Sequence, residues 1–530
     1  MSRRSRKRKR QQQYAKRENK GPDSEPLRSD AMEQAMRGAL AEKGEELPET
    51  TSRSFTRSLQ DIGKRILGGG TGDVTPSRAP RPRGANTQFF KRTGSGDVEL
   101  VIGLDFGTSC TKVVIQDVET RTGYAVPFAT ESDPTGIFLL PTIVSLDDQG
   151  NFNLERRGEE FRGLKENLMN ISMTAPASHD EKRKALMPHT IAYLALMFRE
   201  VRAWFMEEHE EDYAGRRIIW RINVGLPASR FDQPHMPTYY RSTIRDAWYL
   251  STLSNPISKS WASKICDLDT LPSEGTGSLL TPDSIAAFPE VVAAVQGYAK
   301  SSERKEGIHL LIDVGATTLD VTCFRLHTHD HEDSYPIFFA SVRRLGGFEL
   351  FRHRAKVVQG LINSDIDQYM RKMDGVTEPK NPLKLKLELD EEKQLAEDSK
   401  FGDEVGASIW HVIAETKRRK EPHAAEWRSS LPTFLCGGAS GIDIYSQALR
   451  RIDENDTWLG SLNRKELTLP RNVLAPGIAP ALKQRLVVAY GLSFNQFDIG
   501  DLIPQSGIPD PETTESKKQY TESFVTKDMV

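Results

Sequence analysis

One short pattern occurs twice in this chain: an apolar strand that ends in aspartate, a turn of small residues around a glycine, and a second apolar strand. The first copy spans residues 99–115 with Asp105 before the turn, and the second spans residues 308–324 with Asp313 in the same place. Each turn is too short to contain a helix, so both copies are predicted to be β-hairpins. Two such hairpins about two hundred residues apart favour a duplicated architecture in which both turns face one cleft.

Turns of this composition can bind phosphate. Their backbone N–H groups and hydroxyls can surround phosphate oxygens, and a carboxylate at the strand end can hold Mg²⁺ through water. An aspartate here more often bonds its own backbone in an ordinary turn, so it is the recurrence that favours a metal role for Asp105 and Asp313. The candidate nucleotide-binding residues are Gly107, Thr108, Ser109, Thr111 and Lys112 in the first copy and Gly315, Ala316, Thr317, Thr318 and Asp320 in the second.

A third glycine turn follows another apolar strand and contains Gly437, Gly438, Ala439 and Ser440. Its position after a strand resembles that of the two hairpin turns, but it carries no aspartate. We expect it to pack against a nucleoside rather than against a phosphate.

These three segments resemble the phosphate-1, phosphate-2 and adenosine motifs of the actin, sugar-kinase and heat-shock-chaperone ATPase superfamily. Residues 284–298 and 487–492 resemble its two connecting helices. Residues 140–145, 222–227 and 344–349 are similar to the Pro-Ser-Val-Val, Thr-Val-Pro and Leu-Gly-Gly-Glu segments of the seventy-kilodalton heat-shock chaperones. The resemblance covers about residues 98–495, in the order that the family has.

The resemblance implies an α/β fold of two lobes, each built on a ribonuclease-H-like mixed sheet, with ATP and Mg²⁺ at the bottom of the cleft between them. The expected boundaries are a first lobe at 97–300, a second lobe with a helical insert at 301–480, the second connecting helix at 481–495 and a flexible tail at 496–530. A peptide-binding domain like that of the chaperones would need more residues than follow Gly491 in this sequence.

The resemblance also implies roles for single residues. Asp105 and Asp313 would flank Mg²⁺, Thr318 takes the position of the catalytic threonine, and Glu290 would help to align water, although an acid in the first turn of a helix is also favoured by the helix dipole. Lys165 is the candidate for the lysine that meets the γ-phosphate, although exposed lysine is the commoner case, and Lys112 is the alternative. Further expected nucleotide contacts are Gly346 and Gly347, and Glu415, Lys417 and Arg418 on a helix that loosely resembles the adenosine-binding helix.

Two departures from the chaperone pattern bear on activity. Gly441 stands where the chaperones have an arginine that stacks on adenine, so the adenine contact must come from elsewhere, with the helix around Glu415 as one possibility. Ala316 and Thr317 replace two glycines in the second turn, and their β-carbons crowd the close backbone approach that glycine permits. We therefore expect slow turnover.

The first 96 residues differ in composition from the rest of the chain. They hold 22 Lys and Arg against 11 Asp and Glu, with several single prolines and one glycine run, and we expect a disordered basic arm at 1–96. A short amphipathic helix over 54–67 could lie on a membrane or in a partner's groove. The arm could bind nucleic acid, an anionic membrane or an acidic protein, and a merely solubilising tail fits equally well.

The sequence predicts an ATP-binding, slowly hydrolysing ATPase that acts as a chaperone-like switch on a protein partner or client. An actin-like assembly protein is the alternative, and a small-molecule kinase fits less well because no motif supplies its general base. The four cysteines are scattered, and no apolar run reaches the length of about 18 residues that a membrane span needs. A cytoplasmic protein without a transmembrane segment is therefore expected.

Overall fold

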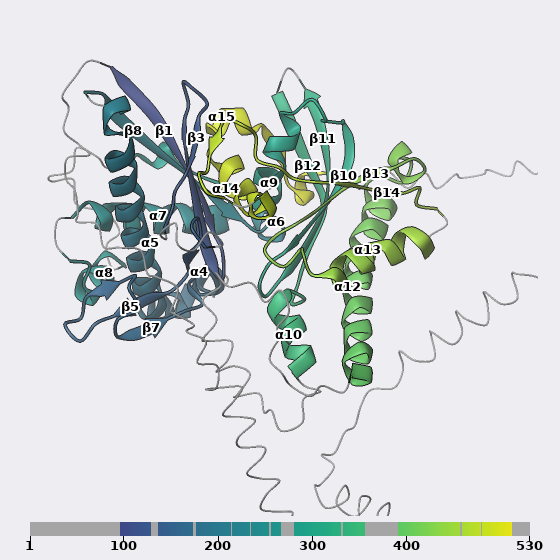
Figure 1. Ribbon diagram of the computed structural model, residues 1–530, viewed down its shortest axis with the longest axis horizontal. Coiled ribbons are helices and arrows are strands. Elements are labelled where there is room, and N and C mark those ends of the chain that lie inside the picture. Colours follow the sequence, from purple (N-terminus) through teal and green to yellow (C-terminus); the bar gives the residue numbers. More distant parts are fainter. Residues whose placement is uncertain are drawn as a thin grey trace, which may run out of the picture. The chain divides into compact units, whose positions relative to one another are not determined.

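The computed structural model describes residues 96–128, 136–172, 176–213, 215–233, 235–253, 256–266, 280–329, 332–355, 391–455, 458–478 and 480–510. Residues 1–95, and with them the basic arm and the helix expected over 54–67, lie outside the described residues. The described chain is a mixed α/β structure with two large sheets and one small one (Figure 1). The prediction of an α/β fold is confirmed at this level.

The first large sheet is built around the first predicted hairpin. β1 (Asp97–Phe106) pairs antiparallel with β2 (Cys110–Asp117), which pairs antiparallel with β3 (Gly123–Ala125) and β4 (Leu140–Pro141). On its other side β1 pairs in parallel with β8 (Arg217–Leu226), and β8 with β9 (Ile285–Pro289). β15 (Val473–Leu474) joins β3 at the edge.

The second large sheet repeats this order around the second predicted hairpin. β10 (Gly307–Val314) pairs antiparallel with β11 (Leu319–His329), and β11 with β12 (Glu332–Arg343). On its other side β10 pairs in parallel with β13 (Leu431–Cys436), and β13 with β14 (Leu462–Lys465). Both sheets thus have three consecutive antiparallel strands followed by two parallel ones, and the expected duplication is present in the strand order.

Helices cover the outer face of the first sheet. They are α4 (Leu164–Ser172), α5 (Pro176–Tyr213), α7 (His235–Thr252) and α8 (Lys259–Cys266), with the short α6 (Ala228–Phe231) after β8. A small sheet of β5 (Val144–Leu146), β6 (Phe152–Asn153) and β7 (Glu159–Phe161) lies on the same side, where β5 and β6 contact α5 (Figure 1). The apolar run at 191–206 lies inside α5, and most of its side chains are buried in the core shared with the sheet.

Two helices pack between the large sheets. α9 (Glu290–Ala299) and α14 (Val487–Leu492) contact each other and share one apolar core with residues of β2, β10, β11 and β13 (Figure 1). Their approach is so close that a Cβ on Gly491 would overlap the carbonyl of Ala293, and a Cβ on Gly103 in β1 would overlap the carbonyl of Ala489. The Asn223 side chain donates hydrogen bonds of 2.8 and 2.7 Å to the carbonyls of Leu492 and Phe494, which closes the end of α14.

The second sheet carries α10 (Gly347–Ala355), α12 (Glu391–Arg419) and α13 (Asp443–Asn455) on its outer side. Phe401, Val405, Ile409, Val412 and Ile413 of α12 are buried, at the spacing of one helix face. α12 is therefore part of the core, and residues 356–390 before it lie outside the described part of the chain. Short 3₁₀ turns complete the structure: η2 (Pro282–Ser284), η4 (Ala425–Trp427), η5 (Pro480–Leu486) and η6 (Gln505–Gly507).

Residues 284–298 were expected to form one helix, and Ile285–Pro289 form strand β9 instead. Pro289 marks the change, since it stands at the N-cap of α9 with φ −60° and ψ 133°. A proline disfavours helical geometry in the residue before it, so the helix can begin only at Glu290. The correction places Glu290 at the point where β9 ends.

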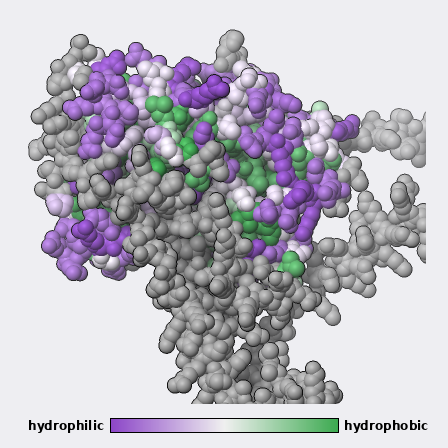
Figure 2. All heavy atoms as spheres, in the orientation of Figure 1, coloured by the Kyte–Doolittle hydropathy of each residue, from purple (hydrophilic) through white to green (hydrophobic). Residues whose placement is uncertain are grey.

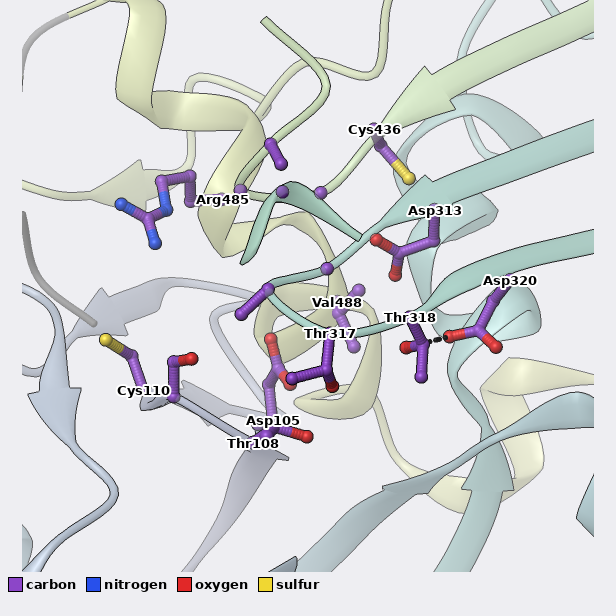
Figure 3. A pocket seen from close by; sticks show the side chains of 18 of the residues that line it. Asp105, Thr108, Cys110, Asp313, Thr317, Thr318, Asp320, Cys436, Arg485 and Val488 are labelled. Carbon is purple, nitrogen blue, oxygen red and sulfur yellow. Dashed lines mark hydrogen bonds between the residues drawn. The ribbon is translucent and has the colours of Figure 1, made fainter. Parts of the chain in front are cut away.

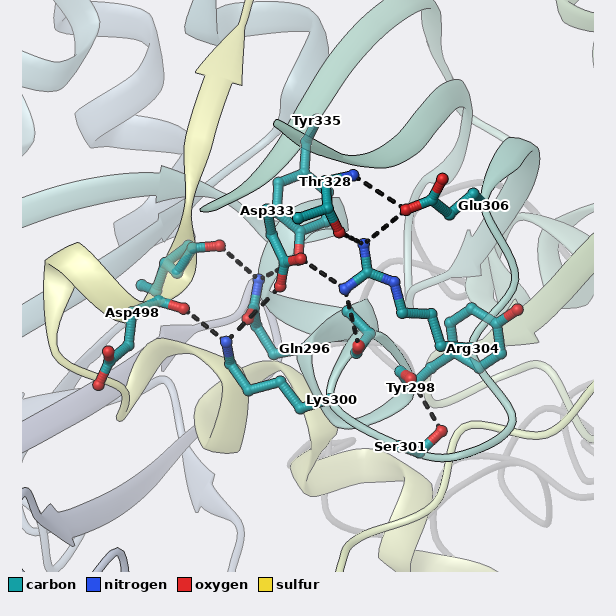
Figure 4. A network of polar contacts seen from close by, with 12 residues as sticks. Gln296, Tyr298, Lys300, Ser301, Arg304, Glu306, Thr328, Asp333, Tyr335 and Asp498 are labelled. Atoms are coloured by element: carbon teal, nitrogen blue, oxygen red, sulfur yellow. Dashed lines mark hydrogen bonds and ion pairs between the residues drawn. The ribbon is translucent and has the colours of Figure 1, made fainter. Parts of the chain in front are cut away.

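The flexible tail expected from residue 496 is also corrected. α15 (Gln496–Ile499) and β16 (Asp501–Ile503) follow α14, and β16 pairs in parallel with β12. A polar network holds this segment (Figure 4): Lys300 Nζ donates to the Asp498 carbonyl at 2.7 Å, and Gln296 Nε2 donates to the Ile499 carbonyl at 3.2 Å. A tail was predicted because the three residues of β16 are too few to give a recognisable strand pattern in the sequence. Residues 511–530 lie outside the described part.

None of the described helices is both long and apolar enough to cross a membrane. Most of the coloured surface on the face shown in Figure 2 is hydrophilic, and its hydrophobic atoms gather in the middle of the view, near α14 in Figure 1.

The glycine at the crossing of α9 and α14 can be tested against a glycine with free space. Gly491→Ala is expected to lower the free energy of unfolding by about 1–3 kcal/mol or more, because its Cβ has to displace helix α9. In Gly406→Ala, within α12, the new Cβ meets no described atom within 4 Å. The better helix propensity of alanine should therefore raise the free energy of unfolding by about 0.5–1 kcal/mol. Chemical denaturation of both variants measures the difference. Equal changes in the free energy of unfolding of the two variants would contradict the close crossing of α9 and α14.

Candidate functional site

Both hairpin turns open on one cavity of about 310 Å³. Its wall is completed by the glycine turn after β13, by η5 and by the start of α14. Figure 3 shows Asp105 and Thr108 on one side and Asp313, Thr317 and Thr318 on the other. The two turns predicted to face each other therefore do so.

The first hairpin carries a charge pair across its strands. Asp105 and Lys112 are register partners, and Lys112 Nζ lies 3.0 Å from Asp105 Oδ2. The Thr142 hydroxyl donates to the Gly107 carbonyl at 2.8 Å and fixes the turn from outside. Gly107, Thr108, Ser109 and Lys112 all line the cavity.

The second hairpin has two acids at the equivalent positions. Asp313 and Asp320 are register partners, and the Thr318 hydroxyl donates to Asp320 Oδ2 at 3.2 Å. Asp320 Oδ1 is buried and has no hydrogen-bond partner within the described chain. Burial, and then the charges of Glu290 and Asp105, raise the pKa of Asp313 to about 7. Burial, and then Asp313, raise the pKa of Asp320 to about 8.

Lys165 and Glu290 form a buried ion pair at the cavity, with Nζ and Oε1 2.7 Å apart. Lys165 comes from the first turn of α4, and Glu290 is the first residue of α9. Burial alone would lower the pKa of Lys165, but Glu290, Tyr240 and Asp105 together outweigh it and the pKa is raised. Lys165 thus stays charged, and it is buried rather than exposed as most lysines are.

The third turn packs against the second hairpin. β13 pairs with β10 so that Cys436 is opposite Asp313, and Gly437 has φ +92° with its missing Cβ pointing at the Asp313 carboxylate. The Ala439 amide donates to the Val314 carbonyl at 3.0 Å. Gly437, Gly438 and Ala439 line the cavity, so this turn lies where it was predicted.

Some predicted site residues serve the scaffold instead. The Thr111 hydroxyl is buried and accepts from Tyr193 at 2.8 Å, and the Ser440 hydroxyl donates to the Gly437 carbonyl at 2.8 Å; neither residue lines the cavity. Gly346 and Gly347 donate their amides to the carbonyls of Thr317 and Gly315. They hold the second turn in place, and of the two only Gly347 reaches the cavity.

The predicted contacts from the end of α12 are not made. Glu415, Lys417 and Arg418 do not line the cavity. The Glu415 carboxylate instead pairs with Arg418 and Arg419 at 2.6 and 2.9 Å, and Lys417 Nζ lies 3.6 Å from the centre of the Trp458 ring. Glu415 and Arg418 thus pair within α12, and Lys417 contacts a residue that follows α13.

The prediction also missed cavity residues, among them Cys110, Phe348, Ile442, Gln484, Arg485 and Val488. Arg485 and Gln484 come from η5, directly before the segment that resembles the second connecting helix. Their nearness to that segment is the one signal that could have indicated them, since neither belongs to a turn motif.

The donor set at the hairpins suits a hard cation. In the described ranges no three His, Cys, Asp or Glu side chains are close enough together to hold a metal ion directly. Mg²⁺ prefers one or two carboxylates and keeps several waters, and Asp105 and Asp313 on opposite walls fit this requirement. The unpartnered Asp320 oxygen also fits a site that binds water or a cation.

A scan against models of known protein families finds no match for this chain, and a search of curated proteins finds no significant relative. The strand order and the cavity described above therefore carry the functional argument.

The raised pKa of Asp320 predicts a pH-dependent cost in stability. An unfolded aspartate titrates near pH 4, so between about pH 4 and 8 the folded state keeps a proton that the unfolded state has lost, and stability falls as pH rises. Asp320→Asn removes this cost. It is expected to raise the melting temperature of the nucleotide-free protein at pH 8.5 by several degrees more than at pH 5.

Thermal unfolding at both pH values checks this. Asp148→Asn, in the exposed turn between β5 and β6, is the control and should change the melting temperature little at either pH. An equal gain from Asp320→Asn at pH 5 and pH 8.5 would show that the carboxyl group is not buried as described.

Proposed function

We propose that this protein is an ATP-binding, slowly hydrolysing switch of the actin, sugar-kinase and heat-shock-chaperone superfamily, whose two lobes close on Mg²⁺-ATP. The observation that carries the proposal is the pair of equivalent hairpins that bring Asp105 and Asp313 to one cavity. We would not expect an unrelated α/β protein to have an acidic turn at the same place in two sheets, with both turns lining one cavity.

The proposed fold is the two-lobed actin-like one. The common order of both large sheets, with three antiparallel strands and then two parallel ones, is what a ribonuclease-H-like sheet requires. The position of α9 and α14 between the sheets fits the connecting helices about which the lobes would turn.

The cavity contains what phosphoryl transfer needs. Positioning and neutralisation of charge do most of the work in such reactions, and Mg²⁺ bound through Asp105 and Asp313 would supply the Lewis-acid part of it. The hydroxyls of Thr108 and Ser109 and the backbone of the turns would hold the phosphates. Lys112 and Lys165 also line the cavity, each paired with an acid of the site, Asp105 and Glu290.

Two acidic groups are placed to handle water. Glu290 is fixed by Lys165 at 2.7 Å, which sets its direction. Asp320 accepts a hydrogen bond from the Thr318 hydroxyl, and both residues line the cavity. We assign Thr318 and Glu290 to positioning the attacking water and Asp320 to accepting its proton.

The first test is nucleotide binding and phosphate release by the full chain. Asp313→Asn keeps the shape of the side chain and removes its charge, and we expect Mg²⁺-dependent ATP binding to weaken at least tenfold and hydrolysis to fall about a hundredfold or more. Asp148→Asn is the control with an exposed aspartate. Phosphate release without an added acceptor distinguishes hydrolysis from a kinase reaction.

If the Asp313→Asn protein binds and hydrolyses ATP as the native chain does, the assignment of this site is wrong. A native chain with no measurable ATP binding would refute the function as a whole.

The second test concerns the slow rate. Thr317→Gly removes the β-carbon at the cavity wall and is expected to raise the single-turnover rate by about three- to tenfold, the equivalent of about 1 kcal/mol. Thr317→Ala keeps the β-carbon and loses the hydroxyl and the γ-methyl group, so its rate should not rise. Rapid-quench measurements compare the three proteins, and a faster Thr317→Ala protein would mean that the groups beyond the β-carbon, and not the β-carbon itself, slow the reaction.

A further inference from the structure

One residue outside the cavity holds the turn of the first hairpin. Thr142, which directly follows β4, donates its hydroxyl to the Gly107 carbonyl and its backbone amide to the Ser109 carbonyl, each at 2.8 Å. Thr142 is buried and does not line the cavity, whereas residues 107–109 do. Both carbonyls are therefore turned toward Thr142 and away from the cavity.

The direction of the Gly107 carbonyl fixes the direction of the next amide. The peptide bond between Gly107 and Thr108 is trans, and a trans peptide unit is planar, with its C=O and N–H pointing in opposite directions. Because the carbonyl points to Thr142, the amide of Thr108 points to the cavity, where Thr108 lies on the wall (Figure 3). No described residue accepts a hydrogen bond from this amide. A backbone N–H presented in such a turn suits an anionic oxygen.

Thr142 is the last member of a buried chain of hydroxyl groups. Tyr193 of α5 donates to Thr111 of β2 at 2.8 Å, and the hydroxyls of Thr111 and Thr142 lie 3.3 Å apart. A hydroxyl has one hydrogen to donate, and Thr142 donates its hydrogen to the Gly107 carbonyl. Thr111 is therefore the donor to Thr142, and the hydrogen bonds run in one direction from Tyr193 to the turn. All three side chains are at most 2 % exposed.

Burial makes this chain favour one orientation of the turn. Hydrogen bonds in a chain polarise one another and are stronger in a low-dielectric interior, and a buried carbonyl that loses its donor is costly. If the peptide between Gly107 and Thr108 turned over, its carbonyl would lose the Thr142 hydroxyl. The carbonyl oxygen, with its partial negative charge, would then face the phosphates in place of the N–H.

We propose that Tyr193, Thr111 and Thr142 form a hydroxyl relay that aims the Thr108 amide at a phosphate oxygen of the bound nucleotide. This inference rests on the proposed function of the site. The three relay residues are positioning residues, since they act through the turn and do not touch the ligand. Thr111, which was expected to contact the nucleotide, thus has an indirect role.

Calorimetric titration of the full chain with Mg²⁺ and either ATP or inorganic tripolyphosphate tests the proposal. Thr142→Val keeps the size and branching of the side chain but has no hydroxyl. It should weaken both ligands by the same factor, about ten- to a hundredfold, because a hydrogen bond to a charged phosphate is lost. Thr142→Ser keeps the hydroxyl and should restore the affinity for both ligands to within about threefold of that of the native chain.

Two variants farther along the relay distinguish positioning from a general loss of stability. Thr111→Val and Thr142→Val each break two hydrogen bonds of the relay, so a purely structural role predicts similar effects on binding. A positioning role predicts that the loss shrinks with distance from the turn, to about threefold in Thr111→Val and less than twofold in Tyr193→Phe. Thermal unfolding of every variant shows its stability separately.

The control is a buried threonine away from the cavity. The Thr416 hydroxyl, within α12, donates to the Val412 carbonyl at 2.8 Å, and neither residue lines the cavity. Thr416→Val therefore loses a hydrogen bond of the same kind and should bind ATP and tripolyphosphate as the native chain does.

The possible results separate the two proposals. Native affinity in Thr142→Val, an equal loss in Thr142→Ser, or a loss for ATP without one for tripolyphosphate would overturn the positioning role alone. Losses of affinity that follow the melting temperatures, rather than the place in the relay, would do the same. A native chain that binds neither ATP nor tripolyphosphate would overturn the proposed function and this inference with it.

Discussion

The close crossing of α9 and α14 is the contact on which the site depends. Because Gly491 has no side chain, α14 can lie directly on the backbone of α9 at Ala293, and Gly103 lets β1 approach α14 equally closely. Both large sheets contribute to the core around these helices. A larger residue at either glycine would separate the sheets, and with them the two hairpin turns that share one cavity.

The two hairpins are equivalent in backbone but not in charge. Opposite Asp105 stands Lys112, which neutralises it, whereas opposite Asp313 stands a second acid, Asp320. Burial and the neighbouring acids raise the pKa of both carboxyl groups, so this wall resists carrying two negative charges. Such an arrangement is unfavourable when the cavity holds only water, and a bound cation would relieve it.

Local chemistry decided which parts of the fold and the site could be predicted. Hairpins, acidic strand ends and glycine turns depend on neighbours in sequence, so Asp105, Asp313 and Gly437 were found. The pairing of β16 with β12 and the position of Arg485 at the cavity depend on packing between segments far apart in the chain. A single sequence does not reveal such packing. The end of α12 resembled a nucleotide-binding helix in composition, yet Glu415 pairs with arginines of its own helix.

The order of the strands along the chain has a consequence for synthesis. β15 completes the first sheet and β16 the second, although both come from the last described part of the chain. Part of the cavity wall is formed by η5 and α14, which are made equally late. During translation β3 and β12 are made before β15 and β16, with which they pair. A nascent chain therefore has two unpaired β-edges at once and is prone to aggregation until the last segments are made.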